Sequence, residues 1–167
     1  MRPGETPGSA IARSVDLARH AEELGFRRFW LAEHHSIEGL AYSATPVLIG
    51  RVDVAARRLF TTPKQRFLRL MRNQPVELLQ PVDSMAGIWS DIERAAVESR
   101  LREAIVGSDS TVKAGLEKLV ADTGADEVIA VTDTWEHEAR LDSYRRVAEI
   151  AGSISEKQPA ETAEASR

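Results

Sequence analysis

The chain has 167 residues, of which 43% are hydrophobic and 29% are charged, and its formal net charge at pH 7 is −4. This length and composition suit one globular domain with a buried core, and no apolar run approaches the length of a membrane-spanning helix. The acidic balance disfavours general nucleic-acid binding, while the absence of cysteine and of a secretory signal pattern leads us to expect a cytoplasmic protein without disulfides.

The first predicted elements are a helix and a buried strand. Thr6 and Pro7 are typical of a helix start, and Gly25 follows the apolar stripe of that helix and ends it. Residues 26–32 are mostly aromatic or aliphatic and too few for an ordinary helix, so they are predicted to form a strand. Residues 43–50, after a loop, are predicted to open a second helix.

Glu33, His34 and His35 follow the predicted strand at its carboxyl end. Loops at that end carry the active site in parallel α/β proteins, so these three residues are candidate catalytic residues. Adjacent residues on a strand face opposite sides, which disfavours a shared metal site and leaves one histidine to transfer protons or contact a reduced cofactor. We favour His34, because Ala32 on its face leaves more room than Leu31 does. The alternative interpretation is a hydrogen-bonded polar cap on the core.

Residues 51–75 are the one basic segment of the chain, with seven basic side chains and one acid. We predict a long amphipathic helix or a pair of helices over 51–72, broken or restarted at Pro63. A polyanion site is one interpretation, but no aromatic interleaving or nucleic-acid motif accompanies these cations, which favours a solvated helix face. Residues 73–89 contain two prolines and a glycine and are predicted to form an irregular loop.

Two later helix starts carry local signals. Ser90 and Glu93 have capping-box spacing and are predicted to open a helix that ends at about Ile105. Gly107 and Ser108 precede the next helix. A glycine and a hydroxyl at that place can cradle a phosphate or form a plain N-cap, and the cap is the commoner arrangement.

The last elements are a predicted strand at 127–132 and an amphipathic helix from about residue 135 to 150, closed at Gly152. Residues 153–167 are polar and alanine-rich without an apolar stripe, and they are predicted to be disordered. Residues 17–35 and 116–137 share one order of helix, glycine, apolar strand, acidic residue and histidine. Successive units of a parallel α/β barrel have this order.

These segments together resemble the bacterial luciferase-like monooxygenases, which are flavin-dependent oxidoreductases built on a TIM barrel. Such a barrel needs about 250 residues, more than this chain has. The segments that carry the resemblance are, in the first half, GETP (4–7), SVDLARHAEELG (14–25), FWLAEHH (29–35) and SATPVLIG (43–50), and in the second half, AARRLF (55–60), PVDS (81–84), IVGS (105–108), TGADE (123–127) and RLDSY (140–144).

The resemblance implies an α/β fold that is an incomplete TIM barrel. In such enzymes a long middle section separates the two halves, whereas here Gly50 runs directly into Arg51, and the first barrel strand is missing ahead of the GETP segment. We therefore predict a single truncated luciferase-like domain over 1–152, with an apparent internal deletion near 50–51. It should be mostly helical with two or three short parallel strands. Loss of the first strand would let strands 27–32 and 127–132 pair through their freed backbone groups.

The resemblance also implies a function. Reduced FMN, or the deazaflavin F420 in its place, would react with O2 and a small organic substrate. Glu33, His34 and His35 would be catalytic, and Gly107 and Ser108 would contact the cofactor. The missing section would hold most flavin-phosphate contacts, so FMN binding should be weak or absent. One helix terminus contributes about 1 kcal/mol, whereas micromolar affinity needs about 8 kcal/mol.

Two other functions remain open from the sequence. One is a non-catalytic remnant or interaction module that forms a homodimer or pairs with a full-length homologue. The other is a binding module that uses the basic helix. No nucleic acid, membrane or metal is expected as a partner.

Overall fold

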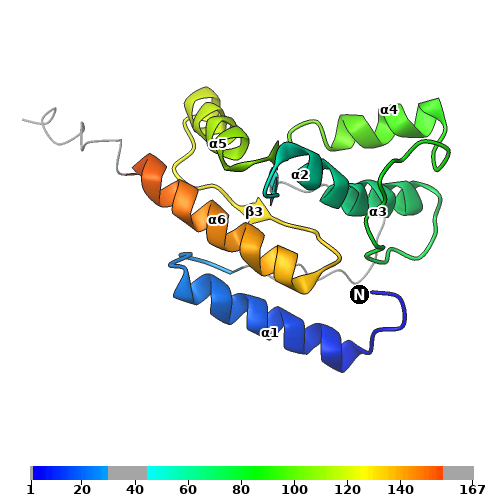
Figure 1. Ribbon diagram of the computed structural model, residues 1–167, viewed down its shortest axis with the longest axis horizontal. Coiled ribbons are helices and arrows are strands. Elements are labelled where there is room, and N and C mark those ends of the chain that lie inside the picture. Colours follow the sequence, from blue (N-terminus) through cyan, green and yellow to red (C-terminus); the bar gives the residue numbers. More distant parts are fainter. Residues whose placement is uncertain (1, 30–44, 156–167) are drawn as a thin grey trace, which may run out of the picture.

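A computed structural model describes residues 2–29 and 45–155 of the chain (Figure 1). Its strands are β1 (Thr45–Ile49), β2 (Ile105–Gly107) and β3 (Ala130–Val131), which form a parallel sheet in the order β2-β1-β3. Six helices accompany them in the described ranges. They are α1 (Pro7–Glu23), α2 (Asp53–Leu59), α3 (Thr61–Met71), α4 (Asp91–Arg100), α5 (Asp109–Thr123) and α6 (His137–Ser155). The predicted fold, mostly helical with two or three short parallel strands and no closed barrel, is confirmed for the described residues.

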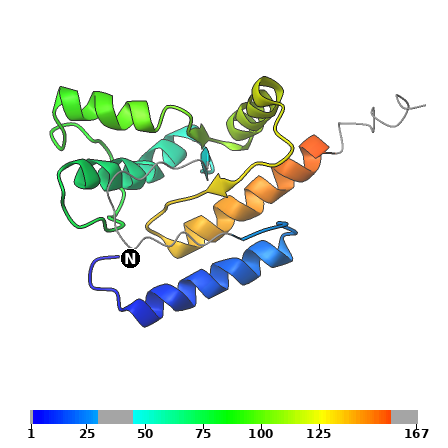
Figure 2. The ribbon, with the colours of Figure 1, turned by 180° about the vertical axis from the view of Figure 1, so that it is seen from behind.

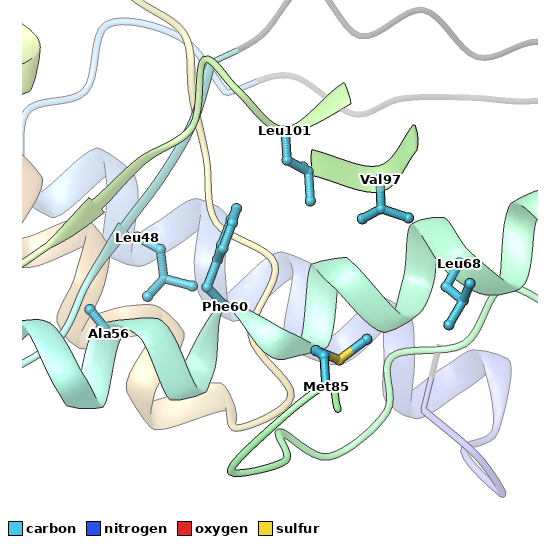
Figure 3. Close-up of a cluster of buried hydrophobic side chains, with 7 residues drawn as sticks. All are labelled: Leu48, Ala56, Phe60, Leu68, Met85, Val97 and Leu101. Carbon is cyan, nitrogen blue, oxygen red and sulfur yellow. The ribbon is translucent and has the colours of Figure 1, made fainter. Parts of the chain in front are cut away.

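The sheet separates two hydrophobic cores. Side chains alternate between the faces of a strand, so Leu48 points into one core while Val47 and Ile49 point into the other. The first core, shown in Figure 3, joins β1 to α2, α3, α4 and the loop before α4 through Leu48, Ala56, Phe60, Leu68, Met85, Val97 and Leu101. The second joins β1 to α5 and α6. Helix α1 lies along the outer side of α6 (Figures 1 and 2).

The central strand β1 corrects one prediction, because residues 43–50 were expected to open a helix. Val47, Leu48 and Ile49 are each no more than 2% exposed. A central parallel strand is covered on both faces and therefore reads as a continuous apolar run. Three apolar residues in a row do not distinguish such a strand from a buried helical turn. In the structure these residues form a strand, because β1 pairs with β2 on one side and with β3 on the other.

Several helix boundaries follow local signals as predicted. Thr6 caps α1 by accepting a hydrogen bond from the backbone N–H of Ser9 (3.3 Å), and Pro7 takes the first helical position. Gly25, with a φ of 78°, turns the chain out of α1. The basic segment forms a helix pair, α2 and α3, because Pro63 cannot donate a hydrogen bond to the carbonyl four residues earlier.

Helix α4 starts as predicted but ends earlier. The Ser90 hydroxyl accepts from the Glu93 N–H (3.3 Å), and the Glu93 carboxylate accepts from the Ser90 N–H (2.7 Å), which completes the capping box. The helix ends at Arg100 rather than near Ile105, because Ile105 begins β2 and pairs with β1. The last helix, α6, starts at His137 and continues through Gly152 to Ser155.

The predicted pairing of strands 27–32 and 127–132 falls partly outside the described residues and stays a prediction. Residues 27–29 form no strand, residues 30–32 lie outside the described residues, and the strand that pairs with β3 is β1. Arg28 still reaches Glu127 in an ion pair of 2.5 Å, so the two segments lie close together. The predicted disordered tail falls mostly in residues 156–167, which are outside the described residues. In the described ranges, no helix combines the length and apolarity that crossing a membrane requires.

Candidate functional site

The carboxyl ends of the three strands meet at one edge of the sheet, because the strands are parallel. Ile49 of β1 is level with Gly107 of β2, and both strands lead directly into helices, α2 and α5. The residues after β3 reach the same edge, since Pro46 pairs with Val131 and the chain then continues past it. Helix amino termini and strand ends that converge in this way form the usual ligand site of an open α/β sheet.

Helix α5 begins at this edge with an anion at its amino terminus. The Ser108 N–H donates to Oδ1 of Asp53 (2.6 Å), and the Thr111 hydroxyl donates to the same oxygen (3.1 Å). These hydrogen bonds, the one from the Ser108 backbone first, hold the pKa of Asp53 below its usual range. The amino terminus of α5 therefore binds a carboxylate supplied by α2.

Gly107 permits this contact by lacking a side chain. A Cβ at this position would lie 2.5 Å from Cγ2 of Thr111 and 2.9 Å from Oδ1 of Asp53. Ser108 occupies the N-cap position of α5, with its hydroxyl 3.3 Å from the hydroxyls of Ser110 and Thr111. The structure thus places both predicted cofactor-binding residues at a helix amino terminus whose N–H group faces an oxyanion.

Two further interactions fix this helix end. Asp109, the first residue of α5, pairs with Arg146 of α6, with Nε 3.1 Å from Oδ1 and Nη2 3.2 Å from Oδ2. Together with Asp53, it places two carboxylates beside the amino terminus of α5. An incoming phosphate would meet the N–H donors, the guanidinium of Arg146 and the repulsion of both acids.

The chain after β3 is tied to the sheet and to α3. The Thr132 hydroxyl donates to the carbonyl of Val47 (2.5 Å), and the Thr132 N–H donates to the hydroxyl of Tyr144 (3.3 Å). Burial raises the pKa of Tyr144. Asp133 then pairs with Arg66 of α3 at 2.5 Å, so the strand end faces α3 across the sheet edge.

Glu33, His34 and His35, the candidate catalytic residues, lie outside the described residues. Their assignment therefore rests on the sequence alone. In the part of the chain that is described, no group of three or more His, Cys, Asp or Glu side chains could hold a metal ion. Asp53 is not among the residues that the sequence predicts for the site, although it is the only acid in the basic segment 51–75, which is a signal that could have found it.

The basic segment uses its cations mainly for ion pairs. Four of its arginines pair with acids elsewhere in the chain: Arg58 with Asp83, Arg66 with Asp133, Arg69 with Glu77, and Arg72 with Glu93. A hollow of about 790 Å³ lies between α2, α3, α4 and the preceding loop. Its charged lining mixes both signs: Arg57, Arg58, Lys64, Arg94, Asp83, Asp91 and Glu98. This arrangement favours the solvated, ion-paired face over a polyanion site.

Part of the sequence is similar to a known family of enzymes. Residues 1–59 fit the family model of the luciferase-like monooxygenases. A luciferase-like monooxygenase of Escherichia coli (strain K12) is 32% identical over 102 residues, which are 61% of this chain and 29% of that protein. The first third of the chain is thus similar to the luciferase-like monooxygenases.

Two relatives from Bacillus subtilis (strain 168) extend the comparison. The protein YvbT is 37% identical over 113 residues, covering 68% of this chain and 34% of YvbT. An N-acetyl-S-alkylcysteine monooxygenase is 43% identical over 56 residues, covering 34% of this chain and 17% of that enzyme. The chain spans no more than 34% of the length of these curated relatives.

Proposed function

We propose that this chain is a flavin-dependent oxidoreductase of the luciferase-like type, acting with reduced flavin and O2 on a small organic substrate. FMN is the proposed flavin, with F420 as the alternative. The observation that supports a flavin site is the Ser108 N–H, which faces an oxyanion 2.6 Å away at the carboxyl end of β2. Similarity to the luciferase-like monooxygenases over part of the chain supports the class of reaction.

The proposed place for the flavin phosphate is the amino terminus of α5, at Gly107 and Ser108. Asp53 already occupies the Ser108 donor, and its lowered pKa keeps it ionised at neutral pH. A phosphate must therefore displace this carboxylate and approach Asp109. A helix terminus contributes on the order of 1 kcal/mol toward an anion, against about 8 kcal/mol for micromolar affinity. The chain alone should bind FMN weakly.

The proposed catalytic residues are Glu33, His34 and His35, which lie outside the described residues. His34 is the residue that we propose moves a proton to or from the reacting group, because an imidazole with a pKa near 6.5 can accept and release a proton at neutral pH. When bound, the flavin would supply the redox chemistry with O2.

A second candidate function is an interaction module that pairs with a full-length homologue or with a second copy. The observation that favours it is the open sheet. Within the described residues, β2 and β3 each pair on one side only, with β1. A strand with a free edge is a template for pairing with another chain.

FMN titration followed by flavin fluorescence tests the first proposal. Asp53→Asn removes the negative charge beside Ser108 and should tighten the binding of FMN without changing the binding of riboflavin, which has no phosphate. Asp122→Asn is the matched control, because Asp122 is an exposed acid near the other end of α5. Equal FMN affinities for both variants would place the phosphate elsewhere. Tight stoichiometric binding by the unmodified chain would refute the expected weak affinity.

Sedimentation separates the second candidate from the first. A chain that works as an interaction module should sediment as a homodimer, or its sedimentation coefficient should rise when it is mixed with a full-length relative. Substrate-dependent O2 consumption by the chain with supplied reduced FMN supports the oxidoreductase. Activity that appears only in the mixture supports the module.

A further inference from the structure

Arginine side chains from separate elements gather around the connection from β3 to α6. Arg2 lies in the segment that leads into α1, and its guanidinium is 5.0 Å from the ring of Trp135, between β3 and α6. Arg66 and Arg140 reach the same place from α3 and α6, because both pair with Asp133.

Two carboxylates in this cluster, Glu5 and Asp133, are already engaged by other groups. Glu5 accepts two hydrogen bonds of 2.7 Å from Arg13, at Nε and Nη2, and one of 2.8 Å from the Arg2 backbone N–H. The Arg2 backbone hydrogen bond is the main reason why the pKa of Glu5 lies below its usual range. The Glu5 carboxylate therefore binds the backbone N–H of Arg2 and the guanidinium of Arg13, and it does not pair with the guanidinium of Arg2.

The guanidinium of Arg2 presents an empty edge. Its Nε and Nη2 atoms are both buried and have no hydrogen-bond partner among the described residues. Two other arginines use their Nε and Nη2 atoms to bind a carboxylate. Arg13 donates from these atoms to Glu5, and Arg72 donates from them to Glu93 at 2.7 and 2.9 Å. This edge matches the two oxygens of a carboxylate or phosphate, and leaving buried donors unpaired costs free energy. Arg2 as a whole residue is half-buried.

Arg140 is a second incompletely paired cation. Its Nε is buried and has no hydrogen-bond partner in the part of the chain that the structure describes. Its Nη2 lies 3.9 Å from Oδ1 of Asp133, which is beyond hydrogen-bond distance. The other oxygen of Asp133 is held by Arg66 at 2.5 Å. Arg140 also lies beside the Tyr144 hydroxyl, where it favours the ionised form of that group.

The cluster therefore carries positive charge that its own acids do not neutralise. Burial is the main reason why the pKa of Arg2 is lowered, and Arg13 and Arg140 lower it further. Glu5 and Glu136 oppose this effect only in part. Two guanidinium groups close enough to repel each other, with unpaired buried donors on both, are stabilised by an anion bound between them.

We propose that Arg2 and Arg140 form a binding site for an oxyanion, either a carboxylate or a phosphate monoester, beside the start of α6. This site is separate from the amino terminus of α5 and does not depend on flavin binding. Arg2 would hold two oxygens through its Nε and Nη2 edge, and Arg140 would donate from Nε.

Thermal melts with inorganic phosphate or acetate, each against sodium chloride at equal ionic strength, test the site. Because a ligand that binds only the folded state raises the melting temperature, about 10 mM phosphate should raise it for the unmodified chain. Arg2→Lys and Arg140→Lys keep the positive charge but lose the planar guanidinium edge. Each substitution should weaken the binding of the anion by about 10-fold or more. Arg145→Lys is the matched control, since Arg145 lies on the outside of α6 and pairs within that helix.

Isothermal titration of the unmodified chain with phosphate and with acetate gives a measurement that needs no variant. Saturable heat with both anions indicates a carboxylate-type site, and heat with phosphate alone indicates a phosphate monoester; either supports the proposal. FMN that binds more tightly than riboflavin, with the difference lost in Arg2→Lys but kept in Asp53→Asn, would identify the flavin phosphate as the source. No saturable heat, or equal melting shifts in the Arg2, Arg140 and Arg145 variants, would overturn the proposal.

Discussion

Gly50 lies where the two halves of the chain meet, and replacing it tests whether they fold as one unit. Its N–H donates to the carbonyl of Gly107 (3.0 Å), which extends the pairing of β1 with β2. A Cβ at this position would lie 2.5 Å from the backbone nitrogen and 2.8 Å from the Cα of Ala56 in α2. Both atoms belong to the main chain, so no side-chain rotation relieves the contact.

The size of the effect follows from these distances. Ordinary contact begins at 3.4 Å, so the shortest distance falls 0.9 Å short (3.4 minus 2.5) and α2 must move away from β1. Such overpacking costs about 1–3 kcal/mol in the free energy of unfolding. In a chain of this size, each kcal/mol lowers the melting temperature by about 2–4 °C. The movement also draws Asp53 away from Ser108, because Asp53 is the first residue of α2.

Thermal unfolding followed by circular dichroism measures this effect. Gly50→Ala should melt below the unmodified chain. Gly152→Ala, inside α6, has no atom within 4 Å of the added Cβ and should be more stable by up to about 1 kcal/mol, because alanine favours helix over glycine. If Gly50→Ala melts at the temperature of the unmodified chain, the close packing of β1 against α2 is wrong.

Three further predictions concern stability and turnover. The pKa of Glu93 is about 2, chiefly because Arg72 donates side-chain hydrogen bonds to it. The contribution of Glu93 to the free energy of unfolding is therefore present above its ordinary pKa of 4.5 and is lost as the pH falls toward 2. The gap between the urea midpoints of the unmodified chain and Glu93→Gln should shrink over that range, and a constant gap would contradict this. In urea unfolding, Leu48→Ala should lower the free energy of unfolding by about 2–5 kcal/mol. The control Ile92→Ala, at an 83% exposed position, should change it by at most about 0.5 kcal/mol. Similar losses in both variants would contradict the assignment of Leu48 to the core. In turnover assays with supplied reduced flavin, His34→Ala should lower the rate by about 10²-fold or more without unfolding the chain, and His35→Ala should chiefly lower stability. Equal, small rate losses would indicate that both histidines are structural.

The sequence predicts those features whose causes lie within a few residues. The cap of α1 at Thr6, its end at Gly25 and the capping box of Ser90 and Glu93 each depend on hydrogen bonds or backbone angles inside one turn of chain. The break between α2 and α3 is equally local, because the N–H that would donate across it is missing from Pro63.

Features that depend on distant partners are the ones that fail. The run Val47 to Ile49 is a strand because β2 and β3 flank it, and both come from the second half of the chain. Helix α4 stops before Ile105 for the same reason. At the site, Ser108 is predicted from its neighbours, whereas its partner Asp53 is 55 residues away and becomes visible only when α2 and α5 are placed together.

Asp53 links the fold and the proposed function in opposite senses. Its carboxylate lies at the amino terminus of α2, where a negative charge is favourable, and it also satisfies the amino terminus of α5 through Ser108. The contact that holds these two helices together is therefore the same contact that fills the predicted phosphate place. A phosphate can gain the Ser108 donor only by breaking the link between α2 and α5. Because these two events are coupled, a substitution that frees the donor for flavin should also lower the stability of the unliganded chain, and bound flavin should restore it.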